Sequence, residues 1–337
     1  MECALSGAAE WSGMRTTDPR IGLVAIGRNE GERLKASLRS VPQGVPIVYV
    51  DSASTDGSAT FARGMGADVV SLDMSLPFTA ARARNEGFRR LVSSRPELDY
   101  VQFIDGDCEL DPHWLDGAAT HLDKNGKLAA VCGRRREKHP EASFYNSLCD
   151  HEWNTPVGLA EACGGDALFR ASAFMSVEGF DPSLLAHEEP DLCSRLRAEG
   201  WLIERLDLPM TLHDAAITSF RQYWRRNTRA GYGYAQVTAK HGGSSFDPAK
   251  KLMQRTVRWA FLLPGICLVL TLLLWPWGAA SWLIFPMQIA RRAASSRLGW
   301  KQAFLELTQK FAEAEGMVKR QIDLTRKRSR DAIQYKN

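Results

Sequence analysis

Residues 101–110, VQFIDGDCEL, place three acids within five positions directly after an apolar run. Two interpretations fit Asp105, Asp107 and Glu109. An Asp-Gly step favours a solvated turn at the end of a strand, whereas clustered carboxylates supply the oxygen ligands that divalent cations prefer. The stretch alone is compatible with both.

Other titratable side chains also follow apolar segments or open helical ones. Asp51 ends the β-branched run in VPIVYVDSASTDGS, Glu188 and Glu189 open a helical segment, and His213 stands in TLHD. Each has an ordinary structural explanation: a helix cap for Asp51, a favourable helix-dipole position for the two glutamates, and a structural hydrogen bond for His213. None of them identifies a site by itself.

The segments that must position these residues alternate between strand and helix patterns. This alternation predicts the α/β class with a parallel sheet, in which ligands gather beyond the carboxyl ends of the strands. Asp51 and Asp105 stand at such ends. Strand patterns occupy 21–30, 45–58, 67–72 and 99–105, and helical patterns occupy 31–41 and 79–94.

Beyond Cys108 the alternation weakens. Residues 128–137 predict a strand, and 160–180 predict a Gly-Gly turn followed by a helical pattern. Residues 189–201 predict a helix, and WLIERLD (201–207) predicts a short strand before LPMTLHD.

Taken in order, these pieces resemble the family 2 glycosyltransferases, whose nucleotide-sugar-binding fold is called GT-A. The motifs that carry the resemblance are RNE (28–30), VDSASTDGS, AARARNEGF, DGD, GGDALFR with GFD, and HEEPDLCSRLRAEGW. The resemblance covers about residues 21–240 and implies a GT-A, Rossmann-like domain. The Gly/Ser-rich stretch HGGSSFDP places the end of this domain near 248, so we expect it over 21–248, after a loose leader over 1–20. The donor-binding residues that it implies are Arg28, Glu30, Asp51, Arg84, Asn85 and Asp105.

The resemblance also implies a chemistry. Asp107, with His213 nearby, would hold a divalent cation (Mg²⁺ or Mn²⁺) on the donor diphosphate, and Asp105 would hold the ribose or a metal-bound water. Glu189 is the implied general base of an inverting displacement. Glu188 is its possible substitute, because many family members have Glu-Asp where this chain has Glu-Glu. The implied acceptor-side residues are Gly164, Gly165, Asp166 and Asp191.

One motif of processive polysaccharide synthases, Gln-x-x-Arg-Trp, is absent. RQYWRRNTRAGYGY supplies Gln222 and Arg225, but Arg226 stands where Trp is expected. We therefore expect one sugar to be transferred per encounter. Glu109 is expected to be an ordinary solvent-facing residue.

Residues 259–290 contain no charged side chain. We expect region 249–337 to be membrane-associating: a hydrophobic helical hairpin at about 257–290, then an amphipathic helix with a basic tail over 298–337. A buried core hairpin is the alternative. Two helices of about 15 residues would each span only about 22 Å, so a re-entrant pair fits as well as full crossing. The amphipathic helix could lie on the inner leaflet or pack as a soluble partner helix.

Basic residues on both sides of the hairpin favour a cytoplasmic location for both of its ends. We therefore expect a bacterial cytoplasmic-membrane enzyme with its catalytic domain on the cytoplasmic side, using a nucleotide-sugar donor and no nucleic acid. The expected acceptor is lipid-linked or membrane-borne, in envelope or exopolysaccharide biosynthesis. Two rival functions are a nucleotidyltransferase, for which AIGRNEGERLK is a poor triphosphate-binding loop, and a catalytically degenerate membrane-bound assembly factor.

Bulk composition narrows the remaining classes. With 337 residues, 45% of them hydrophobic, the chain can bury a sizeable core and is not a disordered protein. Its seven cysteines are odd in number and contain no Cys-x-x-Cys pair, which argues against a disulfide framework and a structural zinc site. This cysteine pattern predicts that the protein resides in a reducing compartment.

Overall fold

Four parallel strands form the first half of the sheet in the computed structural model, which describes residues 20–242, 244 and 247–326. Their order is β3-β2-β1-β4, with the buried strand β1 in the middle. The register pairs Gly27 with Asp51 and Ile26 with Asp105, so the carboxyl ends of these strands meet at one edge. The strands are β1 (Ile21–Gly27), β2 (Ile47–Asp51), β3 (Asp68–Ser71) and β4 (Tyr100–Asp105).

The second half makes the sheet mixed rather than purely parallel. Strand β8 runs antiparallel to both β4 and β6, β6 and β9 are parallel, and β5 and β7 run antiparallel to β9. These strands are β5 (Cys108–Leu110), β6 (Leu128–Glu137), β7 (Gly158–Leu159), β8 (Ala167–Arg170) and β9 (Leu202–His213). The predicted α/β class is confirmed, with a mixed sheet.

Two predictions in this half are wrong in detail. The helical pattern expected after the Gly-Gly turn begins as strand β8, and the helix that follows is short. The short strand expected at 201–207 continues to His213. Both segments are decided by pairing with distant strands, which overrides local periodicity in short apolar runs. The extension of β9 matters for function, because it carries His213 to the sheet edge.

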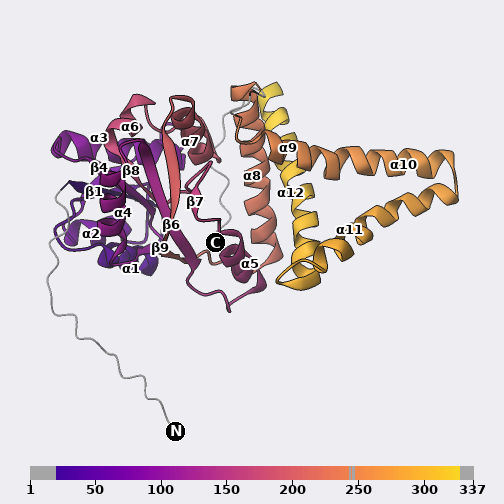
Figure 1. Ribbon diagram of the computed structural model, residues 1–337, viewed down its shortest axis with the longest axis horizontal. Coiled ribbons are helices and arrows are strands. Elements are labelled where there is room, and N and C mark those ends of the chain that lie inside the picture. The colour runs from indigo at the N-terminus through magenta and orange to yellow at the C-terminus, as the bar shows by residue number, and fades with distance from the viewer. Residues whose placement is uncertain (1–19, 243, 245–246, 327–337) are drawn as a thin grey trace, which may run out of the picture.

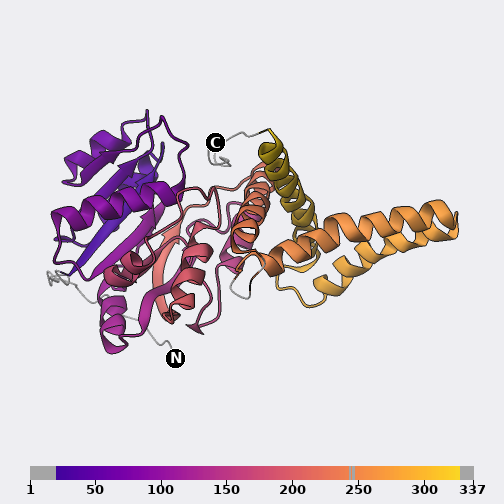
Figure 2. The same cartoon turned by 90° about the horizontal axis from the view of Figure 1, so that it is seen from above.

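Helices flank this sheet on both sides (Figures 1 and 2). They are α1 (Glu32–Ser40), α2 (Ser58–Gly64), α3 (Ala80–Ser94), α4 (Trp114–Lys124), α5 (Phe144–Glu152), α6 (Ala171–Ser176) and α7 (Glu188–Ala198). The six cysteines of the described chain are buried and free.

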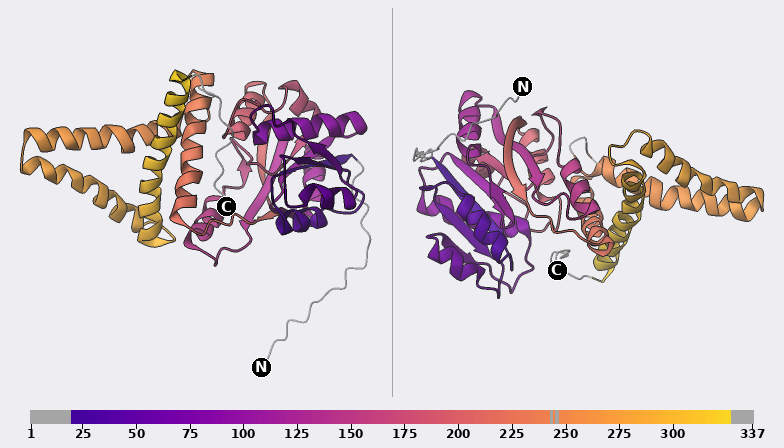
Figure 3. Two further views of the ribbon diagram at one scale, coloured as in Figure 1. Left: turned by 180° about the vertical axis from the view of Figure 1, so that it is seen from behind. Right: turned by 90° about the horizontal axis from the view of Figure 1, so that it is seen from below.

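A long hairpin projects from the other side of the molecule (Figures 1 and 3). Its first arm is one continuous helix, Lys250–Leu273, assembled from α9 (Lys250–Val257), a π-helical turn η1 (Arg258–Leu262) and α10 (Leu263–Leu273). The second arm comprises the 3-10 helix η2 (Trp277–Leu283) and α11 (Ile284–Ala293). The predicted turn near WPWGAAS is present.

The first arm is longer than the sequence pattern predicts. Its 24 residues extend over about 36 Å, because the helix starts before the uncharged run. Among the described residues, this arm is the one helix whose length and apolar composition would allow it to cross a membrane. The tip exposes large apolar side chains, including Leu272 at 73% and Trp277 at 84%.

Helices α8 (Phe220–His241) and α12 (Gly299–Thr325) lie side by side between the sheet domain and the hairpin (Figures 1 and 2). Two glycines let their backbones approach closely: a Cβ at Gly231 would lie 1.9 Å from the Glu313 carbonyl oxygen, and one at Gly316 would lie 2.0 Å from that of Thr228. The predicted amphipathic helix therefore packs as a partner helix on α8.

The outer face of α12 remains apolar and exposed. Trp300 and Phe304 near its start, and Val318 and Ile322 near its end, are between 38% and 63% exposed. Their spacing places them along one stripe, which is interrupted where Phe311 packs on Phe285 of the hairpin. The expectation that this helix contacts the inner leaflet now concerns this stripe and stays a prediction. Within the predicted basic tail, residues 327–337 lie outside the described chain, as does the predicted leader except Arg20.

Candidate active site

The turn after β4 brings the acids of DGD to the sheet edge. Gly106 donates its backbone N–H to the Ile26 carbonyl oxygen at 2.8 Å, which ties the turn to the end of β1. A Cβ at this position would lie 3.1 Å from the same oxygen and 3.3 Å from both Glu30 and Leu34. Glycine therefore permits the close approach that places Asp105 and Asp107 on either side of it.

Asp107 faces His213 across the sheet edge. The Nε2 atom of His213 lies 3.3 Å from Oδ2 of Asp107, both side chains are buried, and the Trp153 ring stacks on the imidazole at 4.7 Å. The other ring nitrogen, Nδ1, is buried without a partner in the described chain. Burial, followed by the charge of Arg135, lowers the pKa of His213 and favours the neutral form that binds metals.

This oxygen and nitrogen pair fits Mn²⁺ or Mg²⁺. Cys108 completes a cluster in which one ligand atom from each residue lies within 4.8 Å of the others. Burial raises the pKa of the Cys108 thiol well above its usual value, so it stays protonated, and its Sγ lies 3.7 Å from Asp107 Oδ1. Asp107 and His213 are thus the residues that would hold a cation.

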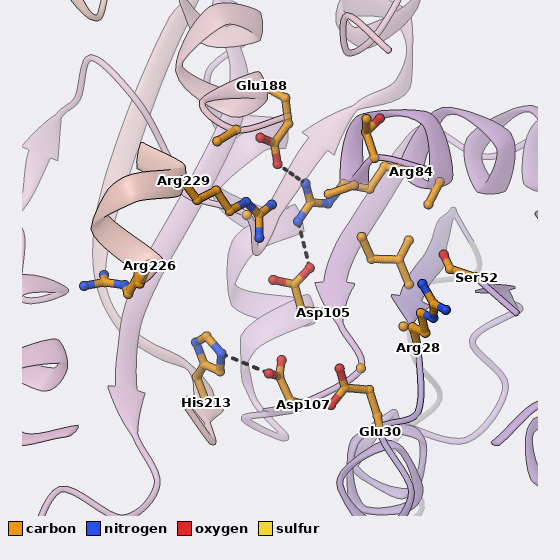
Figure 4. Close-up of a pocket in the computed structure, with 18 of the residues that line it drawn as sticks. Arg28, Glu30, Ser52, Arg84, Asp105, Asp107, Glu188, His213, Arg226 and Arg229 are labelled. Atoms are coloured by element: carbon orange, nitrogen blue, oxygen red, sulfur yellow. Dashed lines mark hydrogen bonds and ion pairs between the residues drawn. The ribbon is translucent and has the colours of Figure 1, made fainter. Parts of the chain in front are cut away.

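Arg84, on α3, joins the two halves of the site. Its Nη2 lies 2.7 Å from Asp105 Oδ1 and its Nη1 lies 2.7 Å from Glu188 Oε1, and the residue is only 2% exposed. Burial would lower the pKa of Arg84, but the two carboxylates outweigh burial and raise it. The guanidinium is therefore a permanent positive charge that fixes both acids (Figure 4).

The structure separates the two adjacent glutamates. Glu188 lines the cavity beside Arg84, whereas Oε1 of Glu189 accepts the Cys163 N–H at 2.6 Å and the Cys193 thiol at 2.9 Å, away from the cavity. Burial would raise the pKa of Glu188, but Arg84 and Arg229 outweigh it and lower the pKa. The geometry therefore favours Glu188 over Glu189 as the reacting carboxylate.

These side chains open into one cavity of about 720 Å³. Figure 4 shows Asp105 and Asp107 between His213 on one side and Arg28 and Glu30 on the other. Of the residues predicted from sequence, those that line the cavity are Arg28, Glu30, Arg84, Asp105, Asp107, Gly165, Glu188 and His213.

Asp51 and Asn85, predicted to bind the donor, do not line the cavity. The Asp51 carboxylate accepts the Tyr49 hydroxyl at 3.2 Å and the Ser54 N–H at 3.0 Å, and its neighbour Ser52 lines the cavity instead. The Asn85 side chain donates from Nδ2 to the Phe180 carbonyl oxygen at 2.6 Å and accepts the Phe180 N–H at Oδ1 at 2.9 Å. These two side chains hold the loops that surround the site.

The predicted acceptor-side acids are also internal. Asp166 is fully buried, with Oδ2 3.0 Å from Arg135 Nε and 3.0 Å from Thr211 Oγ1. Asp191 is equally buried and pairs with basic side chains of α7 and α8, namely Arg195, Lys240 and His241. Both carboxylates form ion pairs with basic side chains inside the fold, and neither lines the cavity.

Gly164 does not line the cavity either, whereas its neighbour does. Gly164 adopts a positive φ of 82°, and a Cβ on Gly165 would lie 2.9 Å from Arg84 Nη2. The Gly-Gly element therefore clears space for the Arg84 guanidinium.

Several cavity residues were not predicted from the sequence. Gln222, Arg226 and Arg229 come from α8, and the last two stand three positions apart and so share a helix face; this spacing is a usable signal. The others are scattered over several elements and loops, as Arg33 in α1 and Arg135 in β6 illustrate, and have no common spacing in the sequence. The missed lining residues include Arg33, Ser52, Phe78, Arg135, Trp153, His187, Gln222, Arg226 and Arg229.

The mixed sheet carries an acid-rich, arginine-lined cavity beside its strand ends, and comparisons with known proteins bear on the class of protein that this arrangement defines. Residues 25–175 match the family model described as "Glycosyl transferase family 2". The fold is similar to that of mannosyltransferase PcManGT from Pyrobaculum calidifontis in complex with GDP-Man and Mn²⁺, with a TM-score of 0.62 at 18% identity over 91% of this chain and 90% of that one.

Two curated relatives are each named pre-mycofactocin glycosyltransferase, from Mycobacterium tuberculosis strains CDC 1551 and H37Rv. Each is 25% identical over 229 residues, which cover 64% of this chain and 46% of the relative. The chain thus spans about half the length of the curated relatives it matches. Residues 25–175 thus match the family 2 model over somewhat less than half of the chain, and the fold of the chain is similar to that of a solved mannosyltransferase.

Proposed function

We propose that this protein is an inverting, metal-dependent glycosyltransferase that moves a sugar from a nucleoside diphosphate donor to a membrane-borne or lipid-linked acceptor. The observation that carries the proposal is the convergence of Asp105, Asp107 and His213 with the Arg84–Glu188 ion pair in one cavity. The family match supports the reaction class.

The cavity offers separate groups for the two halves of the reaction. A cation held by Asp107 and His213 would neutralise the charge that develops on the leaving diphosphate. Arg28, at the end of β1, is a further positive group for that diphosphate. Asp105 is oriented by Arg84 at 2.7 Å and suits hydrogen bonding to the donor.

Glu188 is the candidate proton acceptor. The attacking acceptor oxygen forms a bond to the anomeric carbon, the bond from that carbon to the diphosphate oxygen breaks, and its electron pair leaves with the nucleoside diphosphate. Glu188 takes the proton of a hydroxyl acceptor. Displacement in one step from the opposite face inverts the anomeric configuration.

The exposed hairpin supports a membrane-borne acceptor. Its apolar tip and the apolar stripe of α12 are of the kind that lipid covers. Basic residues such as Arg255 and Arg292 at the two bases of the hairpin suit the cytoplasmic face of a bacterial inner membrane. Anchoring there would concentrate the enzyme beside a lipid-linked substrate of envelope polysaccharide biosynthesis.

A donor panel tests the proposal. Full-length protein in detergent, given GDP- and UDP-sugars with Mn²⁺ or Mg²⁺ and bacterial lipid extract, should release nucleoside diphosphate and label the lipid fraction. EDTA should stop the release. No release across the whole panel, from protein that still melts cooperatively, would refute transfer and favour a non-catalytic assembly role.

A further inference from the structure

Six arginines line the cavity, and they differ in how their charges are compensated. Four of them form ion pairs with carboxylates, as Arg33 does with Glu30 at 2.9 Å and Arg226 does with Glu152 at 3.0 Å. The other two, Arg28 and Arg229, form no ion pair with any described residue. Two positive charges are therefore left for ligands, and they lie on opposite sides of the Arg84–Asp105 pair (Figure 4).

Arg229 is held in place without being neutralised. Its Nε donates to the Leu185 carbonyl oxygen at 3.2 Å, while its two terminal nitrogens have no hydrogen-bond partner in the described chain. The side chain extends from α8 toward the Arg84–Glu188 ion pair (Figure 4). Its charge contributes to the lowered pKa of Glu188, although less than that of Arg84.

A half-buried guanidinium without a counter-ion favours an anionic ligand. Its planar set of donors matches two oxygens of a phosphate, and such charge-assisted bonds are stronger than neutral ones. Removing the guanidinium from water without an anion is unfavourable. The Arg229 guanidinium is therefore available to pair with a phosphate, whereas the Arg84 guanidinium already pairs with two carboxylates.

The position of α8 indicates which substrate brings that phosphate. Arg28 follows β1 at the edge where the metal-binding acids lie, whereas Arg229 belongs to the helix whose opposite face packs on α12. Through α12, this side of the cavity adjoins the exposed hairpin. A substrate that arrives along the hairpin meets Arg229 before it meets Asp107.

We propose that Arg229 binds a phosphate group of the acceptor, close to the oxygen that attacks the sugar. The acceptor class is therefore a lipid that carries a phosphate or diphosphate close to its attacking hydroxyl, rather than an uncharged lipid alcohol. This inference rests on the proposed transferase function. Arg229 contacts the phosphate of the acceptor, beside Glu188, whose carboxylate faces the attacking oxygen.

Binding of matched probes tests the inference without turnover. Full-length protein, saturated with Mn²⁺ and either GDP or UDP, is titrated with farnesyl phosphate, farnesol and inorganic phosphate. Farnesyl phosphate should bind at least about tenfold more tightly than farnesol, since a charge-assisted bond contributes this much. Equal binding of the two isoprenoids would overturn the proposal. Displacement of farnesyl phosphate by inorganic phosphate would support it and assign recognition to the phosphate alone.

Two variants locate the anion. Arg229→Gln should weaken farnesyl phosphate binding about tenfold or more while changing nucleoside diphosphate affinity little. Arg221→Gln, which removes the same charge from an exposed position of α8 outside the cavity, should change neither. If Arg229→Gln weakens GDP or UDP binding as much as farnesyl phosphate binding, Arg229 belongs to the donor site and the proposal is wrong.

The wild-type comparison of the isoprenoid probes remains decisive if Arg229→Gln fails to fold. Arg229→Lys, which keeps the charge but loses the planar donor set, should then retain part of the phosphate preference. Failure of the transferase proposal looks different, because it appears as absent nucleoside diphosphate release by the wild-type protein with every donor.

Discussion

At the scale of single residues, the cation site can be tested directly. Asp107→Asn removes the carboxylate that faces His213 at 3.3 Å, so Mn²⁺ affinity measured by calorimetry in the presence of nucleoside diphosphate should fall about 100-fold or more. Glu109→Gln is the matched control, since Glu109 pairs with Lys138 outside the cavity. Equal losses in both variants would remove Asp107 from the cation site.

The two glutamates provide a second test at this scale. Glu188→Gln should reduce transfer by about 10²- to 10⁴-fold while nucleoside diphosphate binding persists, because a neutral amide cannot take the acceptor proton. Glu189→Gln should reduce transfer far less, since Glu189 bonds to Cys163 and Cys193 away from the cavity. The opposite ranking in initial-rate assays would return the base to Glu189.

At the scale of elements, the contact between α8 and α12 should control stability. Gly316→Ala places a Cβ 2.0 Å from the Thr228 carbonyl oxygen, so the helices must separate, and we expect a loss of about 1–3 kcal/mol in the free energy of unfolding. Gly64→Ala, where no atom lies within 4 Å of the added Cβ, is the control and should be nearly neutral. Urea unfolding of both variants checks this; unchanged stability of Gly316→Ala would mean that the contact is looser than described.

At the scale of the whole molecule, the hairpin should determine membrane binding. Leu272→Asp, at a site 73% exposed on the hairpin tip, should abolish co-flotation of the protein with phospholipid vesicles. Leu159→Asp places the same charge at a site 72% exposed on the sheet domain and should leave flotation intact. Retained flotation of Leu272→Asp would show that the tip does not enter the bilayer, while nucleoside diphosphate binding verifies folding in both variants.

The sequence by itself determined that acidic residues stand at the carboxyl ends of the parallel strands. Short apolar runs that stop at Asp51 and Asp105 predicted a parallel sheet whose carboxyl ends share one edge, and the register confirms that alignment. The pattern also located the exposed hairpin. These features follow from local periodicity and from the geometry of parallel strands, which require no knowledge of distant contacts.

Only the tertiary structure decided which side chains face the cavity. Glu188 and Glu189 are adjacent in sequence, yet one meets Arg84 from α3 and the other meets Cys163. Arg229 also reaches the cavity only because α8 packs across its open side. A motif gives residue types and spacing, but the direction of each side chain depends on pairing between elements far apart in the chain. That physical difference separates the predicted site from the observed one.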